Sequence, residues 1–291
     1  MHTEKATHDV ARMARLLRVS RSGYYAWTRR QAAGPSPAQA RRAALSAKIT
    51  AFHEESDRVY GSPRILADLR EDGEQVSAKT VAKLMRQSGI AGISPRRFTP
   101  VTTVAGPDPA PAPDLVSRRF DRGVLNQVWT SDITYLGTDQ GWLYLCAIKD
   151  ACSRRVIGWA IEDHLRTDLV EAALRMAVTL RGRLPAQVVF HADRGTQYTS
   201  AQIADAALEL GVLRSMGRTG VCWDNAAAET FWSTLKNEFY DRHHWTTKAS
   251  AKQAVGAWIE ERYNRKRRHS AIGMISPVRF EAAQPQTAPA V

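Results

Sequence analysis

Several features are rare or missing in this sequence of 291 residues, and each absence excludes a class of protein. Its three cysteines, Cys146, Cys152 and Cys222, are too few and too scattered for a disulfide framework or a CxxC zinc site. No run of about 18 uncharged apolar residues occurs, so no membrane-spanning helix is expected. Residues 1–18 are polar and interrupted by charge, unlike a secretory signal. No GxxxxGK motif indicates ATP use. We therefore expect a cytoplasmic protein that uses neither zinc nor ATP.

Positive charge is abundant and unevenly distributed. Lys and Arg number 41 against 29 Asp and Glu, a formal net charge of +12. Residues 1–128 hold 21 basic and 12 acidic side chains, residues 129–240 hold 11 and 13, and residues 241–291 hold 9 and 4. Basic flanks around a slightly acidic centre are expected if the flanks bind a polyanion and the centre gathers carboxylates for metal ions. A solvated basic surface without a partner explains the charge equally well.

Helical patterns fill the first third of the chain. Residues 1–33 are predicted to form an N-terminal helical DNA-binding segment, and residues 38–93 a helical domain whose last helix has Ser77 as N-cap. Lys79 and Lys83 lie on the outer face of that helix. A short turn followed by a basic helix is typical of a helix-turn-helix domain, although an ordinary three-helix bundle fits equally well. Residues 9–30 are predicted to form two short helices around a turn. Arginines there recur every three residues as one basic stripe on a helix: Arg12, Arg15, Arg18 and Arg21.

Composition marks the remaining boundaries. Residues 94–117 form a proline-rich linker, and six of the chain's 13 prolines lie in this range. The central segment, residues 118–240, is followed by a basic helical extension over residues 241–281. Residues 282–291 are rich in Pro, Gln and Ala, and we expect them to be a disordered tail.

The central segment alternates strand and helix patterns. Three strands come first and are predicted to form an antiparallel meander; two further strands then alternate with helices. The order indicates a mixed α/β sheet of five strands with helices on its faces. Thr199 and Gln202 fit a capping box, and Asp224 is the expected N-cap of the last helix. Strands are expected at residues 128–136, 142–148, 155–161, 187–191 and 213–216, and helices at residues 167–180, at 199–210 and from about 224.

Three carboxylates fall at notable places in this pattern. Asp132 lies inside the first strand, Asp193 directly follows the fourth, and Glu229 lies one turn into the last helix. A half-buried carboxylate needs a partner, and converging carboxylates are suitable ligands for hard divalent cations. Two such ions about 3.5–4 Å apart can support in-line phosphoryl transfer. The alternative is that each acid pairs with a nearby arginine, such as Arg154 or Arg194.

With these motifs the sequence resembles the catalytic, second-reading-frame transposases of insertion-sequence family three, which are members of the DDE integrase superfamily with an RNase H-like core. The resemblance spans nearly the whole chain. The family's second and third acids are separated by 35 residues, as Asp193 and Glu229 are here, and Lys236 occupies the family's basic position seven residues after the glutamate. The motifs that carry it are Trp129-Thr-Ser-Asp-Ile-Thr-Tyr135, Asp193-Arg-Gly-Thr-Gln-Tyr-Thr-Ser200, and Asp224-Asn225 followed by Glu229.

The resemblance implies an RNase H-like integrase core preceded by helix-turn-helix modules, and a DNA transposase. Asp132, Asp193 and Glu229 would be its catalytic and metal-binding triad, with Mg²⁺ as cofactor and Mn²⁺ able to replace it. Water would hydrolyse one strand at the end of the element, and the resulting 3′-OH would attack another phosphodiester. The zinc module of retroviral integrases is absent, and Ala192 and Gly217 replace residues that are often Ser in the family.

DNA is the implied partner, both as terminal inverted repeats and as target, held at the nucleoid by a homodimer or a larger assembly. An upstream-frame DNA-binding partner or fusion is a further expectation. The run over residues 262–270 interleaves cations with hydrogen-bond donors and an aromatic, as a phosphate-binding element does, whereas the alternative is a solvated charge run. The expected DNA contacts are Lys236, Asn225, Arg265, Lys266, Arg267, Arg268, His269, Arg21, Lys79 and Lys83.

Two other functions remain open from the sequence. A transposase-derived DNA-binding regulator without catalysis would be unaffected by the loss of the carboxylate at Asp132. An RNase H-like nuclease would nick nucleic acid without joining strands. The intact acidic triad favours an enzyme over the regulator, and the flanking basic modules favour a transposase over a simple nuclease.

Overall fold

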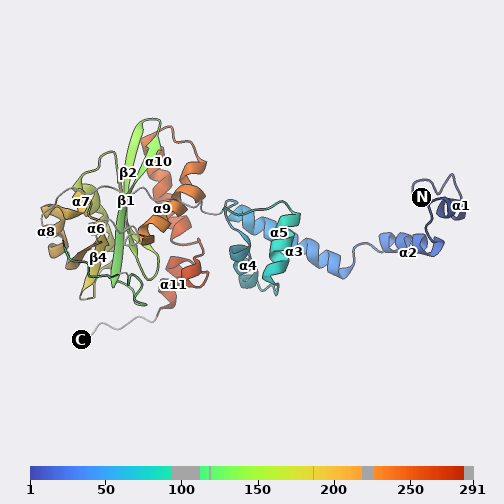
Figure 1. Ribbon diagram of the computed structural model, residues 1–291, viewed down its shortest axis with the longest axis horizontal. Coiled ribbons are helices and arrows are strands. Elements are labelled where there is room, and N and C mark those ends of the chain that lie inside the picture. Colours follow the sequence, from blue (N-terminus) through green and yellow to red (C-terminus); the bar gives the residue numbers. More distant parts are fainter. Residues whose placement is uncertain (94–111, 118, 186, 218–225, 285–291) are drawn as a thin grey trace. The chain divides into compact units, whose positions relative to one another are not determined.

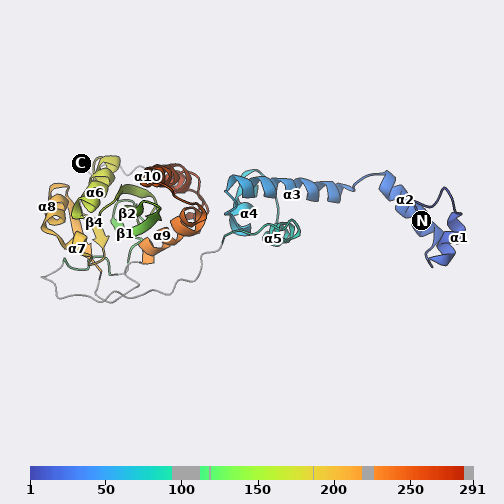
Figure 2. The ribbon, with the colours of Figure 1, turned by 90° about the horizontal axis from the view of Figure 1, so that it is seen from above.

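The chain divides into two compact units, Met1–Gly92 and Ile93–Val291. The computed structural model describes residues 1–93, 112–117, 119–185, 187–217 and 226–284, with the backbone alone for residues 226–229. Most of the proline-rich segment and the end of the predicted tail therefore lie outside the described residues. Figures 1 and 2 show the elements of each unit from two directions. Within the described ranges, no helix is long and apolar enough to cross a membrane.

The N-terminal segment contains two short helices. The residue between them, Arg18, has a φ of 53°, a left-handed conformation that interrupts the helix. The predicted single basic stripe is therefore wrong, because Arg12 and Arg15 belong to the first helix whereas Arg21 begins the second. The two helices are α1 (Val10–Leu16) and α2 (Arg21–Ala32).

Three further helices form the remainder of the first unit. A capping box between Ser36 and Gln39 starts the first of them, and Ser77 is the N-cap of the last, as predicted. Lys79 and Lys83 are exposed on that last helix. The three helices are α3 (Pro37–Glu55), α4 (Ser62–Glu71) and α5 (Ala78–Gln87). Their shared core consists of Leu45, Ile49, Ile65, Leu69, Val81, Leu84 and Met85.

The second unit is built on a mixed five-stranded sheet of order β3-β2-β1-β4-β5. The first three strands form the predicted antiparallel meander, and β4 and β5 add to it in parallel. The prediction of a mixed α/β sheet with flanking helices is confirmed. The strands are β1 (Val128–Thr138), β2 (Gly141–Asp150), β3 (Val156–Glu162), β4 (Val188–Ala192) and β5 (Val212–Met216).

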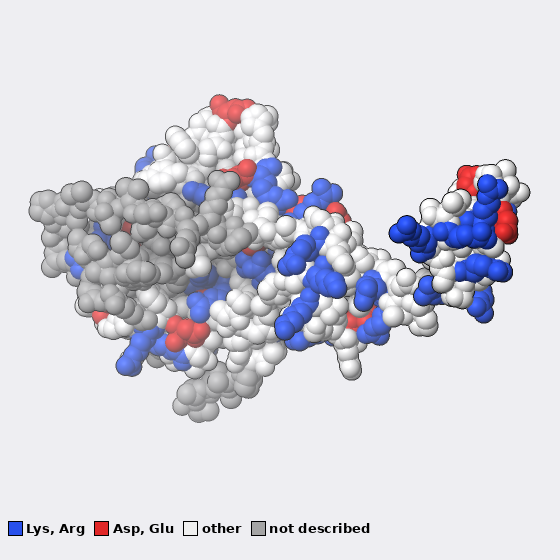
Figure 3. Space-filling view, turned by 45° about the vertical axis from the view of Figure 1, so that its right-hand side comes forward, with Lys and Arg blue, Asp and Glu red and all other residues white. Residues whose placement is uncertain are grey.

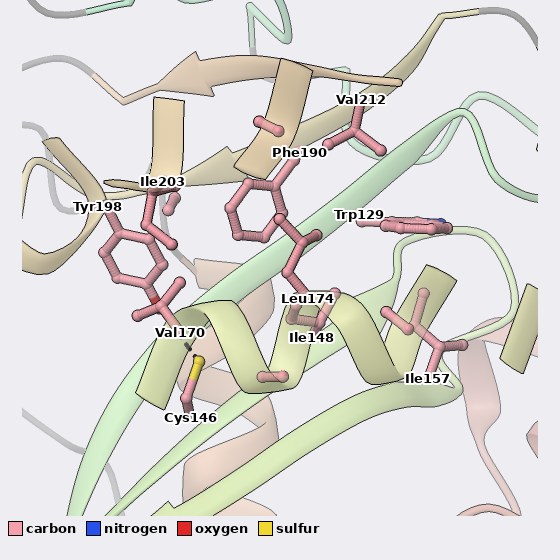
Figure 4. Packing of buried hydrophobic residues seen from close by; sticks show 14 of the residues in the cluster. Trp129, Cys146, Ile148, Ile157, Val170, Leu174, Phe190, Tyr198, Ile203 and Val212 are labelled. Carbon is pink, nitrogen blue, oxygen red and sulfur yellow. Dashed lines mark hydrogen bonds between the residues drawn. The ribbon is translucent and has the colours of Figure 1, made fainter. Parts of the chain in front are cut away.

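Helices cover both faces of this sheet, as Figure 2 shows. On one face, α6 (Thr167–Arg181) and α8 (Ala201–Glu209) pack on an apolar cluster that includes Trp129, Ile148 and Phe190 (Figure 4). On the other face, α9 (Ala226–Glu238) and α10 (Lys248–Ala257) pack on the alternate strand residues. Alternation along the strands therefore sends neighbouring side chains of β1 towards α6 or towards α9.

One predicted helix start is wrong by a residue. The short helix α7 (Thr196–Thr199) precedes α8, and Ser200 rather than Thr199 is the N-cap of α8, accepting a hydrogen bond from the Ile203 N–H. Gln202 does not complete a capping box, because its amide donates to Glu171 at 2.7 Å. A serine and a threonine in succession give the sequence two equivalent candidates, and the turn of α7 selects between them.

The basic C-terminal extension packs on the same sheet as α9. It contains the short helices η2 (Tyr240–Arg242) and η4 (Ser270–Ile272), the π-helix η3 (Trp258–Tyr263) that continues α10, and α11 (Pro277–Ala283). Asn264 is hydrogen-bonded through its side chain to both backbone groups of Val156 on β3. Helix α11 reaches two residues into the predicted tail, and its Glu281 is hydrogen-bonded to Ser153, Arg155 and Arg181. The extension is thus part of the second unit's core.

Candidate active site

Asp132 lies in the middle of β1 and faces α9. Its neighbours Ser131 and Ile133 belong to the opposite, α6 side of the sheet. The Asp132 carboxylate accepts two hydrogen bonds: Oδ2 from the indole Nε1–H of Trp232 at 2.9 Å, and Oδ1 from the Ile133 backbone N–H at 2.8 Å. The carboxylate is therefore held in one orientation towards α9, and the side chain is only partly buried.

Asp193 lies beside Asp132 at the carboxyl end of β4. The parallel pairing of β1 with β4 matches Val128 with Val189 and Thr130 with His191. Asp132 follows Thr130 by two residues on β1, and Asp193 follows His191 by two residues just past the end of β4, so the two acids lie on neighbouring segments of the chain. Asp193 is exposed, and its Oδ1 accepts the Gly195 backbone N–H at 3.0 Å. Sheet register thus brings two of the predicted acids together.

The buried hydroxyl of Tyr198 lies close to these two carboxylates. The Tyr198 hydroxyl is hydrogen-bonded to Ser131 Oγ at 2.9 Å and contacts Cys146 Sγ at 3.7 Å, the contact drawn in Figure 4. Burial raises the pKa of Tyr198 well above its ordinary value, and Cys146, Asp132 and Asp193 raise it further. The hydroxyl therefore stays protonated, and it links the turn after Asp193 to β1 next to Asp132.

The third predicted acid is carried by α9. Glu229 lies in this helix one turn before Trp232, so the two positions share a helix face, and Trp232 is the residue bonded to Asp132. The side chain of Glu229, together with Asp224 and Asn225, lies outside the described residues. Lys236, one turn after Trp232 on the same helix, is half-buried. The geometry brings the helix of the third acid against the strand of the first.

The side chains present suit a hard divalent cation. Asp132 and Asp193 offer carboxylate oxygens from adjacent strands, and such oxygens are the ligands that Mg²⁺ and Mn²⁺ take from proteins. Among the described side chains, one other group could approach a metal ion: Glu162, Asp163 and His164. Lys252 lies 2.9 Å from Glu162 and Lys248 3.5 Å from Asp163, so ammonium groups already neutralise those acids.

The predicted DNA contacts in the C-terminal run divide into exposed and buried residues. Arg265 and Lys266 are exposed, and half-buried Arg268 donates to the Met274 carbonyl at 2.8 Å. Arg267 and His269 are buried, at 7% and 8% exposure. The interpretation of these two as DNA contacts is corrected here, because a side chain enclosed by protein cannot reach a phosphate.

Arg267 has an internal carboxylate partner instead. Its Nε and one terminal nitrogen donate to the two oxygens of Glu238 on α9, at 2.7 and 2.6 Å. His269 packs edge-on against the Tyr263 ring. In the first unit, Arg21, Lys79 and Lys83 are exposed, and Figure 3 shows Lys and Arg along its helices.

Sequence reasoning missed the role of Trp232. Its large apolar ring predicts core packing, and the side chain is indeed 8% exposed. The hydrogen bond to Asp132 joins residues 100 positions apart. The one available signal was its position three residues after Glu229, on the helix face expected to meet the acids.

Known proteins are similar to this chain in both of its units. An integrase core domain matches residues 125–222 and a second one residues 210–277, and an HTH-like domain matches residues 40–98. The chain is 38% identical over 277 residues to transposase InsF for insertion sequence IS3A of Escherichia coli (strain K12), covering 95% of each protein. It is 35% identical over 276 residues to a 31 kDa protein of insertion element IS600 from Shigella sonnei, covering 95% of this chain and all of that one. The solved catalytic core domain of BIV integrase aligns with 53% of this chain and 93% of its own, at 18% identity and a TM-score of 0.40.

Proposed function

The chain belongs to the IS3 family of insertion-sequence transposases, and we propose that it cuts and rejoins DNA at the ends of such an element in a reaction dependent on divalent metal ions. Asp132, Asp193 and Glu229 would be the catalytic triad. The observation that supports the proposal is that Asp132 and Asp193 lie on or directly after the neighbouring strands β1 and β4, while Trp232 ties Asp132 to the helix of Glu229. Two of the three acids and the helix of the third thus lie in one region at the middle of the sheet.

The chemistry needs few groups from the protein. In the first step the oxygen of water bonds to phosphorus, the bond from phosphorus to the 3′ oxygen breaks, and that oxygen takes a proton. In the second, the new 3′-OH attacks another phosphodiester and one 3′-OH leaves, so the number of ester bonds is unchanged and no ATP is needed. Bound Mg²⁺ or Mn²⁺ would neutralise charge on the attacked phosphate.

The protein's own contribution is placement. Asp132 and Asp193 hold their oxygens at fixed positions on adjacent strands, and Glu229 completes the set from α9. Lys236, two turns after Glu229, can contact a phosphate beside the site. Trp232 keeps the Asp132 carboxylate turned towards α9.

DNA would be held mainly outside this core. Exposed Arg21, Lys79 and Lys83 would contact the terminal inverted repeats, and exposed Arg265 and Lys266 would contact the backbone close to the core. Two element ends must be joined, so a dimer or larger assembly on DNA at the nucleoid follows from the proposal. An upstream-frame partner or fusion would add further DNA-binding surface.

The test is a cleavage and joining assay on DNA carrying the native ends of the element, with Mg²⁺ or Mn²⁺. Glu229→Gln and Asp132→Asn keep the side-chain size and remove the charge; both are expected to abolish 3′-OH formation and joining. Asp205→Asn, on the exposed side of α8, is the matched control and should remain active.

Other outcomes would support other functions. Nicking without joining would favour the nuclease. Intact DNA binding without any product would indicate a non-catalytic regulator or a missing upstream partner, and repeating the assay with the fused upstream frame separates these two.

A further inference from the structure

A hollow of about 670 Å³ lies beside the hairpin that joins β1 to β2. Its volume lies in the range of small-ligand pockets, about 300–1,000 Å³. It is bounded by the hairpin on one side and by the end of α9 with the segment after it on the other. The lining residues that matter here are Tyr135, Asp139, Trp142, Lys236, Asp241 and His244.

One indole ring forms a fixed, open platform at this hollow. Trp142 is paired across the hairpin with Gly137, and a Cβ added to Gly137 would meet the ring at 3.4 Å, so one face of the indole lies on the glycine backbone. The Tyr135 ring meets it edge-on, with centroids 6.4 Å apart and planes at 84°. Trp142 is nevertheless 59% exposed and Tyr135 53% exposed. One face of this platform, the Trp142 ring, therefore packs on the hairpin, and the other face is exposed to solvent.

The walls of the hollow are braced by hydrogen bonds to the hairpin. Tyr240 donates its hydroxyl to the Gly137 carbonyl at 2.9 Å, and the Asp139 N–H donates to the Trp245 carbonyl at 3.0 Å. His244 Nε2 lies 2.9 Å from Asp139 Oδ1. Because the two sides are joined in this way, a ligand would meet a preformed shape and would lose little free energy in ordering it.

Two independent elements place the hollow at a similar distance from the proposed triad. Tyr135 follows Asp132 by three residues on β1, about 10 Å at the rise of a strand. Lys236 follows Glu229 by seven residues on α9, also about 10 Å at the rise of a helix. Ten ångströms is about three base steps along one DNA strand.

We propose that this hollow binds an unpaired nucleobase of the DNA substrate, stacked on the open face of Trp142 about three nucleotides from the bond that is cut. The inference rests on the proposed function. The lining favours a base over a phosphate, because a phosphate site is lined by cations whereas here Asp139 and Asp241 accompany Lys236. Carboxylates accept hydrogen bonds from exocyclic amino groups, which adenine, cytosine and guanine have and thymine lacks.

The test is equilibrium binding of the full chain, without divalent metal, to a short duplex that is blunt or carries a three-nucleotide unpaired extension. Fluorescence anisotropy gives the affinity for the blunt duplex and for each extended duplex. The unpaired extension consists of adenine, cytosine or thymine nucleotides and is tested at the 3′ end and at the 5′ end of a strand. Wild type should prefer extended DNA, with thymine the weakest. Trp142→Ala should weaken binding of extended DNA about 5-fold to 150-fold and leave blunt DNA unaffected. Trp142→Phe should retain most of the preference.

Leu208→Ala, at an 83% exposed position on α8, is the control for loss of an exposed apolar side chain and should bind like wild type. The inference is overturned if Trp142→Ala binds extended DNA as wild type does, or if it weakens blunt and extended DNA equally. If Trp142→Ala changes the sedimenting mass of the protein but not its DNA binding, the platform contacts a second copy of the chain and not a base. This binding test does not measure cleavage, so it is independent of the proposed function. If the wild type binds as expected but shows no activity in the cleavage and joining assay, only the proposed function is contradicted. If the wild type is active but shows no preference for extended DNA, only this inference is contradicted.

Discussion

The hydrogen bond from Trp232 to Asp132 can be deleted while most of the aromatic packing is kept. Trp232→Phe removes the Nε1–H donor that lies 2.9 Å from Asp132 Oδ2. A hydrogen bond to a charged group contributes about 1.5–3 kcal/mol, which corresponds to about 10-fold to 150-fold. Residues that orient metal ligands typically change metal affinity or activity by about 10–100-fold. We therefore expect cleavage by this variant to need more Mg²⁺, to slow at least about tenfold, or both.

Trp258→Phe is the matched control for this prediction. Trp258 is also 8% exposed in the same apolar cluster, and its ring stacks on Phe239 with centroids 5.6 Å apart. Both changes replace a buried indole by a smaller ring, so both should lose similar packing energy, and Trp232→Phe should lose about 1.5–3 kcal/mol more with its hydrogen bond. Only Trp232→Phe should shift the metal dependence. Single-turnover cleavage over a series of Mg²⁺ concentrations, with urea unfolding of each variant, measures the two effects, and equal metal curves for the two variants would refute the reasoning.

Three further predictions concern the C-terminal extension. Glu281 is enclosed at 10% side-chain exposure, and Glu281→Ala should lower the unfolding free energy by about 3 kcal/mol, because two partly buried arginines lose their shared carboxylate. Burial alone would raise the pKa of Glu281, but hydrogen bonds from Arg181, Ser153 and Arg155 bring it below its ordinary value of 4.5. Its stabilisation is therefore present above about pH 4.5 and is lost as the pH falls through the folded-state pKa, so urea unfolding should show the difference from wild type shrinking in acid. Arg267→Ala should cost about 3–5 kcal/mol of stability through Glu238. By contrast, exposed Arg265→Ala should change stability by less than about 0.5 kcal/mol and lower the salt dependence of DNA binding by about one counterion, and the reverse pattern would contradict the assignment.

Strands and helices of the core were predictable because their periodicities are strong. All five strands were placed within about two residues, since alternation along β1 and the short apolar runs of β4 and β5 are visible without any partner. The N-cap of α8 and the position of the turn between the two predicted N-terminal helices were not, because neighbouring residues offered equivalent local choices. In both cases a few backbone angles decide between alternatives that sequence leaves equal in energy.

The proximity of Asp132 and Asp193 follows from the predicted strands, but the buried partners of charged residues were not predictable. Residue spacing and resemblance identify Asp132 and Asp193, and sheet register then makes them neighbours. The sequence alone does not show that Arg265 is exposed whereas Arg267 is buried, because the partner of Arg267, Glu238, lies 29 residues earlier on α9. Such pairings depend on how α9 and the extension pack against each other. Local sequence patterns do not indicate which residues that far apart in the chain come into contact.

The same packing explains how the extension holds the helix of Glu229 against the sheet. Asp132 lies within β1, paired with Ala147 of β2, and Asp193 directly follows β4, which is paired with β1 and β5. Glu229 has no such support, because a helix on a sheet can slide or rotate with little change in its own hydrogen bonds. The apolar face of α9 is enclosed between the sheet on one side and α10 with η3 on the other. Its C-terminal end is held by Arg267 at Glu238, and the extension in turn is bonded to β3 through Asn264. Residues up to about forty places later in the chain therefore hold α9 on the sheet, and the extension packs as part of the same unit as α9.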